Sequence, residues 1–136
     1  NGVRLTTVEA IETNLASNFY RMPDDARFMI EDRIAMRSAA DFELYCVAVA
    51  RSVHGMVDEA VLDKLQNISV PTLIFFGEND MLIPNRYLNP GFTRKIAESG
   101  AARIQGSKLV MVPQCGHFMM FEKPEVFNSE TRNFLK

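Results

Sequence analysis

Hydrophobic residues in the first half of the chain recur every three or four positions, which is the period of an amphipathic helix. The first such stretch follows Thr6 and Glu9, which match a helix-capping box, and it stops at Arg21-Met22-Pro23. Its apolar positions are Val8, Ile11, Leu15 and Phe19. The pattern therefore predicts a helix that begins at the capping box and ends before Pro23.

Three further helices are predicted before residue 66. Asp24 or Asp25 can cap the second, and Ser38 with Asp41 opens the third, which we expect to end near Gly55. The fourth is shorter. Their apolar positions are Phe28, Ile30, Ile34 and Met36; Leu44, Val47, Ala48 and Ala50; and Val57, Val61 and Leu65. We therefore expect residues 1–65 to form a helical region.

The second half of the chain changes to strands. Residues 72–76 form a short, unbroken apolar run between Pro71 and Gly77, which is typical of a strand buried on both faces of a parallel sheet. A second strand is predicted at 108–112, with a helix at about 92–105 between the two and another from Pro124. This order predicts a βαβ crossover with one covering helix, and so an α/β fold over residues 66–136.

Composition excludes several classes of protein. The chain has 136 residues, 47% hydrophobic and 24% charged, as in an ordinary globular domain, and its net charge of −2 gives no basic field for nucleic acid. No apolar run approaches the roughly 20 residues of a membrane span. Two cysteines without metal-ligand spacing favour a reducing, cytoplasmic location, no metal and no cofactor.

Each predicted strand leads to a side chain capable of proton chemistry. Asp80 ends the sequence Gly-Glu-Asn-Asp after the first strand, and His117 follows Gly116 after the second. Because the carboxyl ends of paired parallel strands lie at one edge of a sheet, Asp80 and His117 can meet there. A carboxylate that accepts a hydrogen bond from Nδ1 orients an imidazole so that Nε2 can take a proton from a nucleophile. For either residue alone an ordinary role is favoured, Asp80 as a turn residue and His117 as a loop histidine, whereas both together predict a catalytic pair.

Residues 68–136 resemble the C-terminal segment of the α/β-hydrolase fold. The motifs that carry the resemblance are Ile68 to Leu73, Gly77 to Asp80, Leu82 to Pro84, Gly116 to Phe118, and Glu122 to Phe127. The resemblance implies that Asp80 is the acid and His117 the base of a catalytic triad. It also implies that residues 1–65 are the helical cap, or lid, that many members insert before the acid-bearing strand, and that residues 66–136 are the C-terminal part of the core.

The resemblance stops short of a complete triad. Members carry the nucleophile on a Gly-x-Ser-x-Gly elbow that precedes the acid and the histidine, and the seven glycines of this sequence form no such elbow. We therefore expect the chain to be a segment that is inactive alone and that pairs with a missing N-terminal half or with a second copy. A serine would imply hydrolysis of an ester, amide or carbon–carbon bond in a small apolar or aromatic substrate. An aspartate would imply an epoxide hydrolase or dehalogenase.

Other readings remain open in the sequence. Cys115 is a weaker candidate for the nucleophile because it lies only two residues from His117, and Glu78 could replace Asp80 as the orienting acid. His54 is read as a surface or hinge histidine. Three methionines, Met81, Met119 and Met120, are read as pocket or core filler. The rival to a hydrolase is a non-catalytic binding or assembly module derived from one.

Overall fold

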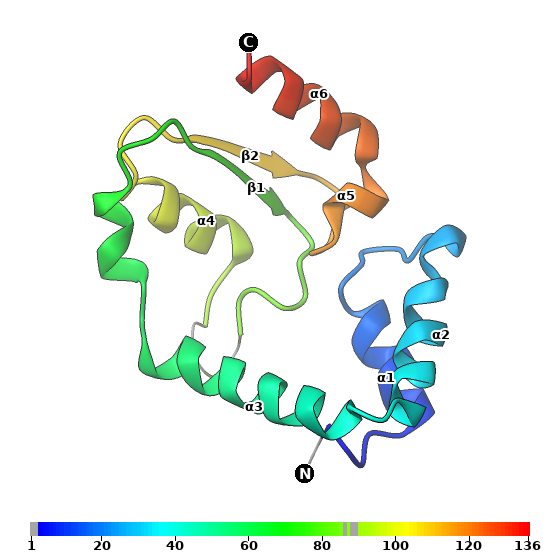
Figure 1. Cartoon of the computed structure of the whole chain (residues 1–136). Coiled ribbons are helices and arrows are strands. Elements are labelled where there is room, and N and C mark those ends of the chain that lie inside the picture. Colours follow the sequence, from blue (N-terminus) through cyan, green and yellow to red (C-terminus); the bar gives the residue numbers. More distant parts are fainter. Residues whose placement is uncertain (1–2, 86, 88–89) are drawn as a thin grey trace.

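The computed structural model describes residues 3–85, 87 and 90–136. The first half is helical, and the second alternates strands with helices, as Figure 1 shows. The helical elements of the first half are α1 (Val8–Ala16), η1 (Asp24–Ala26), α2 (Phe28–Ala35), η2 (Met36–Ser38), α3 (Phe42–Asp58) and η3 (Leu62–Asn67). The second half contains β1 (Leu73–Gly77), α4 (Thr93–Ala101), β2 (Lys108–Val112), α5 (Met119–Glu122) and α6 (Pro124–Phe134).

The two strands form the parallel sheet that the sequence predicts. They pair in register from Leu73 opposite Lys108 to Gly77 opposite Val112, so that both end at the same edge. Helix α4 makes the crossover and contacts both strands, while α6 lies on the other face, where the rings of Phe75 and Phe127 are 4.9 Å apart. Among the described residues the sheet has these two strands.

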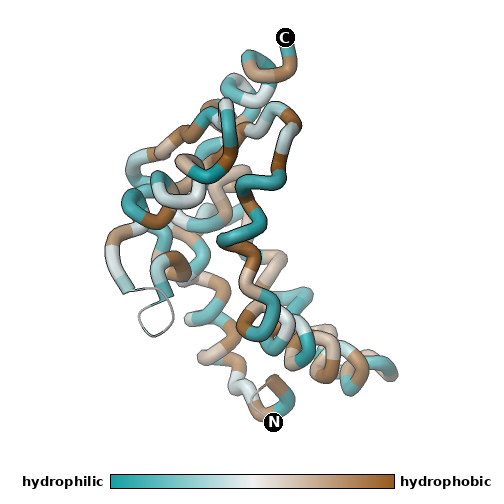
Figure 2. The backbone as a smooth tube through the Cα atoms, turned by 90° about the vertical axis from the view of Figure 1, so that its left-hand side faces the viewer, coloured by the Kyte–Doolittle hydropathy of each residue, from teal (hydrophilic) through white to brown (hydrophobic). Residues whose placement is uncertain are grey.

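The best-buried cluster lies beneath the carboxyl end of β2. Val112, Cys115 and Met119 form it, with partly buried residues of β1, β2 and α6 around them. Much hydrophobic surface remains open elsewhere. The tube in Figure 2 carries hydrophobic positions along its whole length, and the exposed large ones include Leu44, Val53, Met56, Val57 and Val61. A surface of this kind is typical of a face that another element covers.

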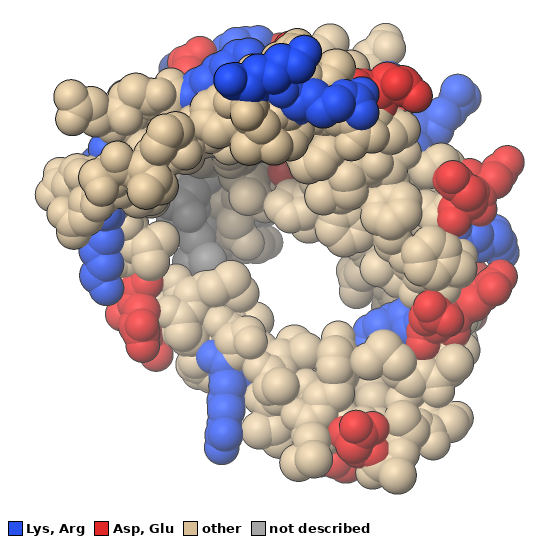
Figure 3. Space-filling model, turned by 45° about the horizontal axis from the view of Figure 1, so that its top comes forward, with Lys and Arg blue, Asp and Glu red and all other residues tan. Residues whose placement is uncertain are grey.

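An opening passes through the middle of the molecule in Figure 3. Uncharged side chains line most of its rim, whereas most of the charged ones project from the outside. The strand β1 is also less buried than the sequence predicts, because Leu73 to Phe76 are only partly buried. The prediction of a strand buried on both faces is therefore wrong for this structure. β1 is only partly buried because one helix on each face and one neighbouring strand cannot cover it completely.

The helix boundaries of the first half differ from the predictions in four places, the first of which is the end of α1 at Ala16 instead of just before Pro23. Thr7, not Thr6, caps α1, and its hydroxyl accepts from the backbone N–H of Ala10 at 3.2 Å. Asp24 and Asp25 lie inside η1 instead of capping α2. Helix α3 continues through Gly55 to Asp58, since one glycine costs a long helix only about 1 kcal/mol.

Two later segments also differ from the predictions. The predicted fourth helix, which was expected to include Val57, is the short 3-10 helix η3 and begins C-terminal to that residue. The helix expected at 92–105 ends at Ala101. The chain after Ala101 continues as hydrogen-bonded turns up to Gly106, which has a φ of 71°. That backbone conformation favours glycine and ends the segment before β2.

Candidate active site

Gly77, at the end of β1, lets the loop that follows it approach the loop after β2 closely. A Cβ atom added to Gly77 would lie 2.2 Å from the carbonyl oxygen of Gly116 and 2.3 Å from that of Cys115. No real side chain tolerates such contacts with backbone. The loops are joined directly, because the N–H of Glu78 donates to Val112 and the N–H of Asn79 donates to Cys115. The glycine therefore brings the Asp80 loop against the His117 loop.

Asp80 is held by its own turn. Its side chain is 3% exposed, and its Oδ1 accepts hydrogen bonds from the backbone N–H groups of Leu82 and Ile83 at 2.8 and 3.1 Å. The apolar residues that follow Asp80 therefore supply main-chain donors that fix the carboxylate. Its second oxygen, Oδ2, remains to accept from another group.

That other group is the imidazole of His117. Nδ1 of His117 lies 2.8 Å from Oδ2 of Asp80, although 37 residues separate them in the sequence. A carboxylate offers only acceptors, so the shared hydrogen belongs on Nδ1, and in the neutral imidazole Nε2 then carries a free lone pair. The His117 side chain is 38% exposed, so this pair combines a buried acid with a base that solvent or a substrate can reach. Such an arrangement can remove a proton from a nucleophile.

A segment of the helical half fixes the backbone around His117. The carbonyl oxygen of Asn18 accepts from the N–H groups of His117 and Phe118, at 2.7 and 3.0 Å. Phe19 is 2% exposed and meets the ring of Phe118 edge to face, with the ring centres 5.4 Å apart. Phe19 was predicted as part of the first helix, but it lies beyond the end of α1 and packs against the histidine loop instead.

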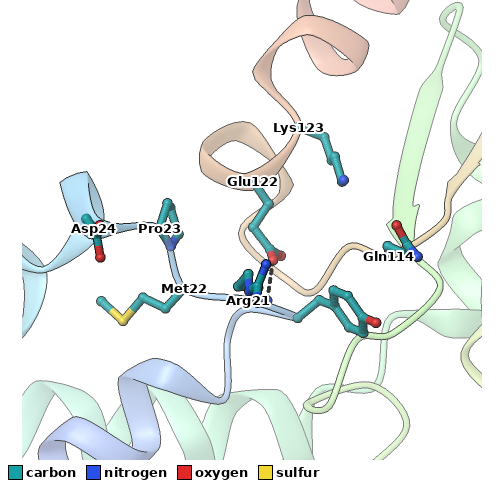
Figure 4. Close-up of a pocket in the computed structure, with 8 residues that line it drawn as sticks. Arg21, Met22, Pro23, Asp24, Gln114, Glu122 and Lys123 are labelled. Carbon is teal, nitrogen blue, oxygen red and sulfur yellow. Dashed lines mark hydrogen bonds between the residues drawn. The ribbon is translucent and has the colours of Figure 1, made fainter.

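Glu122 connects the same two regions from the other side. Its Oε1 accepts from the N–H of Arg21 at 2.7 Å, and its Oε2 accepts from the N–H of Gly116 at 2.6 Å. Figure 4 shows this carboxylate pointing toward Arg21 at one wall of an open cavity of about 550 Å³. The cavity is lined by Tyr20, Arg21, Met22, Pro23, Asp24, Gln114, Glu122 and Lys123.

The rival candidates from the sequence occupy less suitable positions. Glu78 forms an ion pair with Arg94, so its carboxylate has a partner other than His117. Cys115 is fully buried, and burial, with a smaller contribution from Glu122, raises the pKa of its thiol to about 11. A protonated, inaccessible thiol is a poor nucleophile at neutral pH. His54 lies on the exposed surface of α3, and Met119 is buried in the core while Met81 and Met120 are exposed.

Arg33 of α2 is a further feature of the helical half. Its guanidinium carbon lies 4.6 Å from the ring centre of Tyr45 and 5.8 Å from that of Phe42. Its Nη1 is buried and has no hydrogen-bond partner among the described residues. Arg33 also lines an apolar cavity of about 380 Å³. Phe118, the residue after His117, lines the same cavity. A buried guanidinium nitrogen without a hydrogen-bond partner is a candidate for binding an anionic group.

The sequence analysis missed Asn18, Glu122 and Arg33. Asn18 acts through its backbone carbonyl, which every residue possesses, so its side-chain identity carries no signal. Glu122 begins the motif Glu122 to Phe127, one of those that resemble the α/β-hydrolase fold, and this motif was the available signal that the residue is functional. No cluster of three or more His, Cys, Asp or Glu residues that could hold a metal ion occurs in residues 3–85, 87 and 90–136.

The profile of the alpha/beta hydrolase family matches residues 4–130 of this chain. The chain belongs to the alpha/beta hydrolase family. The match includes the helical half as well as the strands, so the helices that precede β1 are part of the family's sequence pattern. Both Asp80 and His117 fall within it.

Two curated hydrolases resemble the chain over about half of its length. A 2-hydroxy-6-oxononadienedioate/2-hydroxy-6-oxononatrienedioate hydrolase of Klebsiella pneumoniae is 36% identical over 72 residues, which are 53% of this chain and 22% of that protein. A proline iminopeptidase of Thermoplasma volcanium is 32% identical over 79 residues, 58% of this chain and 23% of that protein. The matched segment is therefore less than a quarter of either relative.

Solved hydrolase structures share the fold. A protein of Pseudomonas aeruginosa described as a probable hydrolytic enzyme aligns with 98% of this chain at a TM-score of 0.85 and 20% identity, and the chain covers 46% of it. A serine hydrolase involved in carbazole degradation aligns with 96% of the chain at a TM-score of 0.73 and 24% identity, with 47% of that structure covered. The chain thus corresponds to just under half of each hydrolase.

Within the part of the chain that the structure describes, no helix has both the length and the apolar character needed to cross a membrane.

Proposed function

We propose that Asp80 and His117 are the acid and the base of a nucleophile–His–Asp triad whose nucleophile lies outside these 136 residues. The observation that carries the proposal is the 2.8 Å contact between Oδ2 of Asp80 and Nδ1 of His117 at the common edge of the two strands. The family's order of nucleophile, acid and histidine also supports it, because the acid and the histidine occur here in that order.

The pair would perform two proton transfers. Nε2 of His117 takes the proton from the nucleophile as it attacks the scissile carbon, and the same proton then passes to the leaving group. A water molecule then attacks the enzyme-bound intermediate with the same two proton transfers, and this releases the product. Asp80 remains ionised throughout and stabilises the imidazolium. The bond broken would be an ester or carbon–carbon bond of a small apolar or aromatic substrate.

The proposal includes a second part of the protein. The opening in Figure 3 and the exposed apolar residues of α3 suit contact with a further segment of the same fold. A two-stranded sheet is also only marginally stable without more strands. We therefore expect the 136 residues alone to be inactive. The alternative is a non-catalytic module that uses the same surfaces for assembly.

A serine-directed fluorophosphonate probe separates these possibilities. In the full-length protein we expect one probe per chain, attached outside residues 1–136 and absent after heat denaturation, because the nucleophile depends on His117 for activation. Intact mass and peptide mapping measure the uptake. The 136-residue chain alone should take up no probe. A full-length protein that takes up no probe and hydrolyses neither ester, epoxide nor carbon–carbon substrates would be the non-catalytic module.

Arg33 suggests a carboxylate on the substrate. Its buried Nη1 lacks a partner among the described residues, and the Klebsiella relative is named for a dicarboxylate substrate. Arg33→Gln in the full-length enzyme should raise KM for a carboxylate-bearing substrate by about 10- to 100-fold, as for loss of a hydrogen bond to a charged group. For an uncharged ester, KM should stay nearly constant. Arg37→Gln is the matched control, since Arg37 is exposed at the end of the same helical region. Equal effects of Arg33→Gln on both substrates would disprove the assignment.

A further inference from the structure

Glu122 joins two segments that are far apart in the sequence. One carboxylate oxygen binds the N–H of Arg21, which lies 101 residues away, and the other binds the N–H of Gly116, immediately before His117. We call these two hydrogen bonds the Glu122 bridge. Both bonds have a charged acceptor, and such bonds are shorter and stronger than neutral ones. The bridge therefore ties the loop before His117 to the segment after α1.

The same two segments are also in close contact at the α-carbon of Gly116. A Cβ atom added to Gly116 would lie 2.6 Å from the nitrogen of Tyr20 and 2.7 Å from the oxygen of Asn18. That oxygen of Asn18 also accepts from the N–H groups of His117 and Phe118. Consequently the three successive N–H groups of residues 116–118 all donate hydrogen bonds. The N–H of Gly116 donates to Glu122, and those of His117 and Phe118 donate to Asn18. The helical half of the chain, and not only the sheet, sets where His117 lies.

The position of Glu122 separates it from the reacting groups. The hydrogen bonds described for its carboxylate go to backbone N–H groups, whereas the imidazole of His117 is bound by Asp80. Glu122 lines the cavity of Figure 4, and neither Asp80 nor His117 lines that cavity. The carboxylate therefore acts on His117 through the backbone of Gly116.

We propose that Glu122 is a positioning residue, which fixes the His117 backbone to the helical half so that Nε2 keeps its alignment with the nucleophile. This inference rests on the proposed function, because it assigns Glu122 a role in the same triad. A displacement of about 1 Å can cost about 100-fold in rate, so a small shift of the loop should be visible in kcat. Because both carboxylate oxygens of Glu122 are bound to backbone N–H groups, we expect the effect to fall on kcat and to leave KM unchanged.

Glu122→Gln in the full-length enzyme tests the bridge with almost no change in side-chain shape. Glutamine offers one acceptor and one NH₂ donor, so one of the two N–H groups would face another donor. We expect kcat to fall by about 10- to 100-fold with KM unchanged. We also expect hydrogen exchange at the amides of 116–118 to accelerate by about tenfold or more, the size of a lost charge-assisted hydrogen bond. Glu125→Gln is the control, because Glu125 is exposed in the first turn of α6.

Glu122→Asp provides a second variant if the glutamine variant folds poorly. Aspartate keeps both acceptor oxygens on a side chain that is one methylene shorter, so its kcat should fall between wild type and Glu122→Gln. Wild-type kcat in both variants would overturn the positioning role. Unchanged exchange at 116–118 would overturn the bridge itself. If the wild-type protein hydrolyses nothing, the proposed function and the positioning role both fail, and the exchange rates still decide whether the Glu122 bridge exists.

Discussion

His117→Ala in the full-length protein should abolish turnover with little effect on folding. Loss of the histidine from a Ser–His–Asp enzyme can cost about a million-fold in kcat, because the nucleophile then has no base. The cost in stability should be small, since the imidazole is 38% exposed and water can replace it at Oδ2 of Asp80. Steady-state kinetics and a thermal melt of the same preparation measure both effects.

The chain offers a matched control for this experiment. Of its two histidines, the other is His54, which lies exposed on α3. His54→Ala should therefore retain the wild-type kcat and melting temperature. If His117→Ala retained activity within about tenfold, or if His54→Ala lost as much as His117→Ala, the assignment of the base would be wrong, given how much a triad histidine contributes.

The edge of the sheet could be predicted because its signals are local. Residues 72–76 and 108–112 are short and mostly apolar, with proline or glycine at or near their ends, and their pairing needs only the rule for parallel strands. The structure contains both strands in register, shifted by one residue at β1. The meeting of Asp80 with His117 followed from the same rule and is present at 2.8 Å. Their catalytic role remains a prediction.

The contacts around that edge could not be predicted because they join distant segments. Phe19 has helical spacing from Leu15, yet its ring is buried against Phe118, a contact that only the folded chain creates. Arg21 and Gly116 donate through backbone groups, so no side-chain pattern marks them as partners of Glu122. The error at Gly55 has another cause: glycine signals a helix end in general, but it costs a long helix only about 1 kcal/mol, and α3 continues to Asp58.

The incomplete burial of β1 has a different cause. An apolar run without alternation indicates a strand whose two faces are both apolar and would both be buried. The run itself does not specify how many strands and helices bury them. The structure shows Leu73 to Phe76 only partly buried, and the chain covers just under half of each of two hydrolases with the same fold. The apolar composition of β1 therefore suits the larger sheet that the proposed function requires.

Asp80→Asn should slow the full-length enzyme by about 10,000-fold while leaving the fold intact, by analogy with other triads. The amide oxygen can still accept from the N–H groups of Leu82 and Ile83, so the turn is preserved. The amide NH₂, however, would face Nδ1 of His117 and donate to it. That places the imidazole hydrogen on Nε2, where it blocks uptake of the proton from the nucleophile.

Glu78→Gln is the decisive comparison for this prediction. Glu78 lies two residues before Asp80 and pairs with Arg94, so its replacement should leave kcat near the wild-type value. Asp80→Asn and Glu78→Gln differ little in size or in the charge they remove, so a loss confined to Asp80→Asn isolates the hydrogen bond to Nδ1. The reverse pattern, with activity lost in Glu78→Gln and kept in Asp80→Asn, would make Glu78 the acid that orients His117. It would also require the Glu78–Arg94 ion pair to break before the enzyme could act.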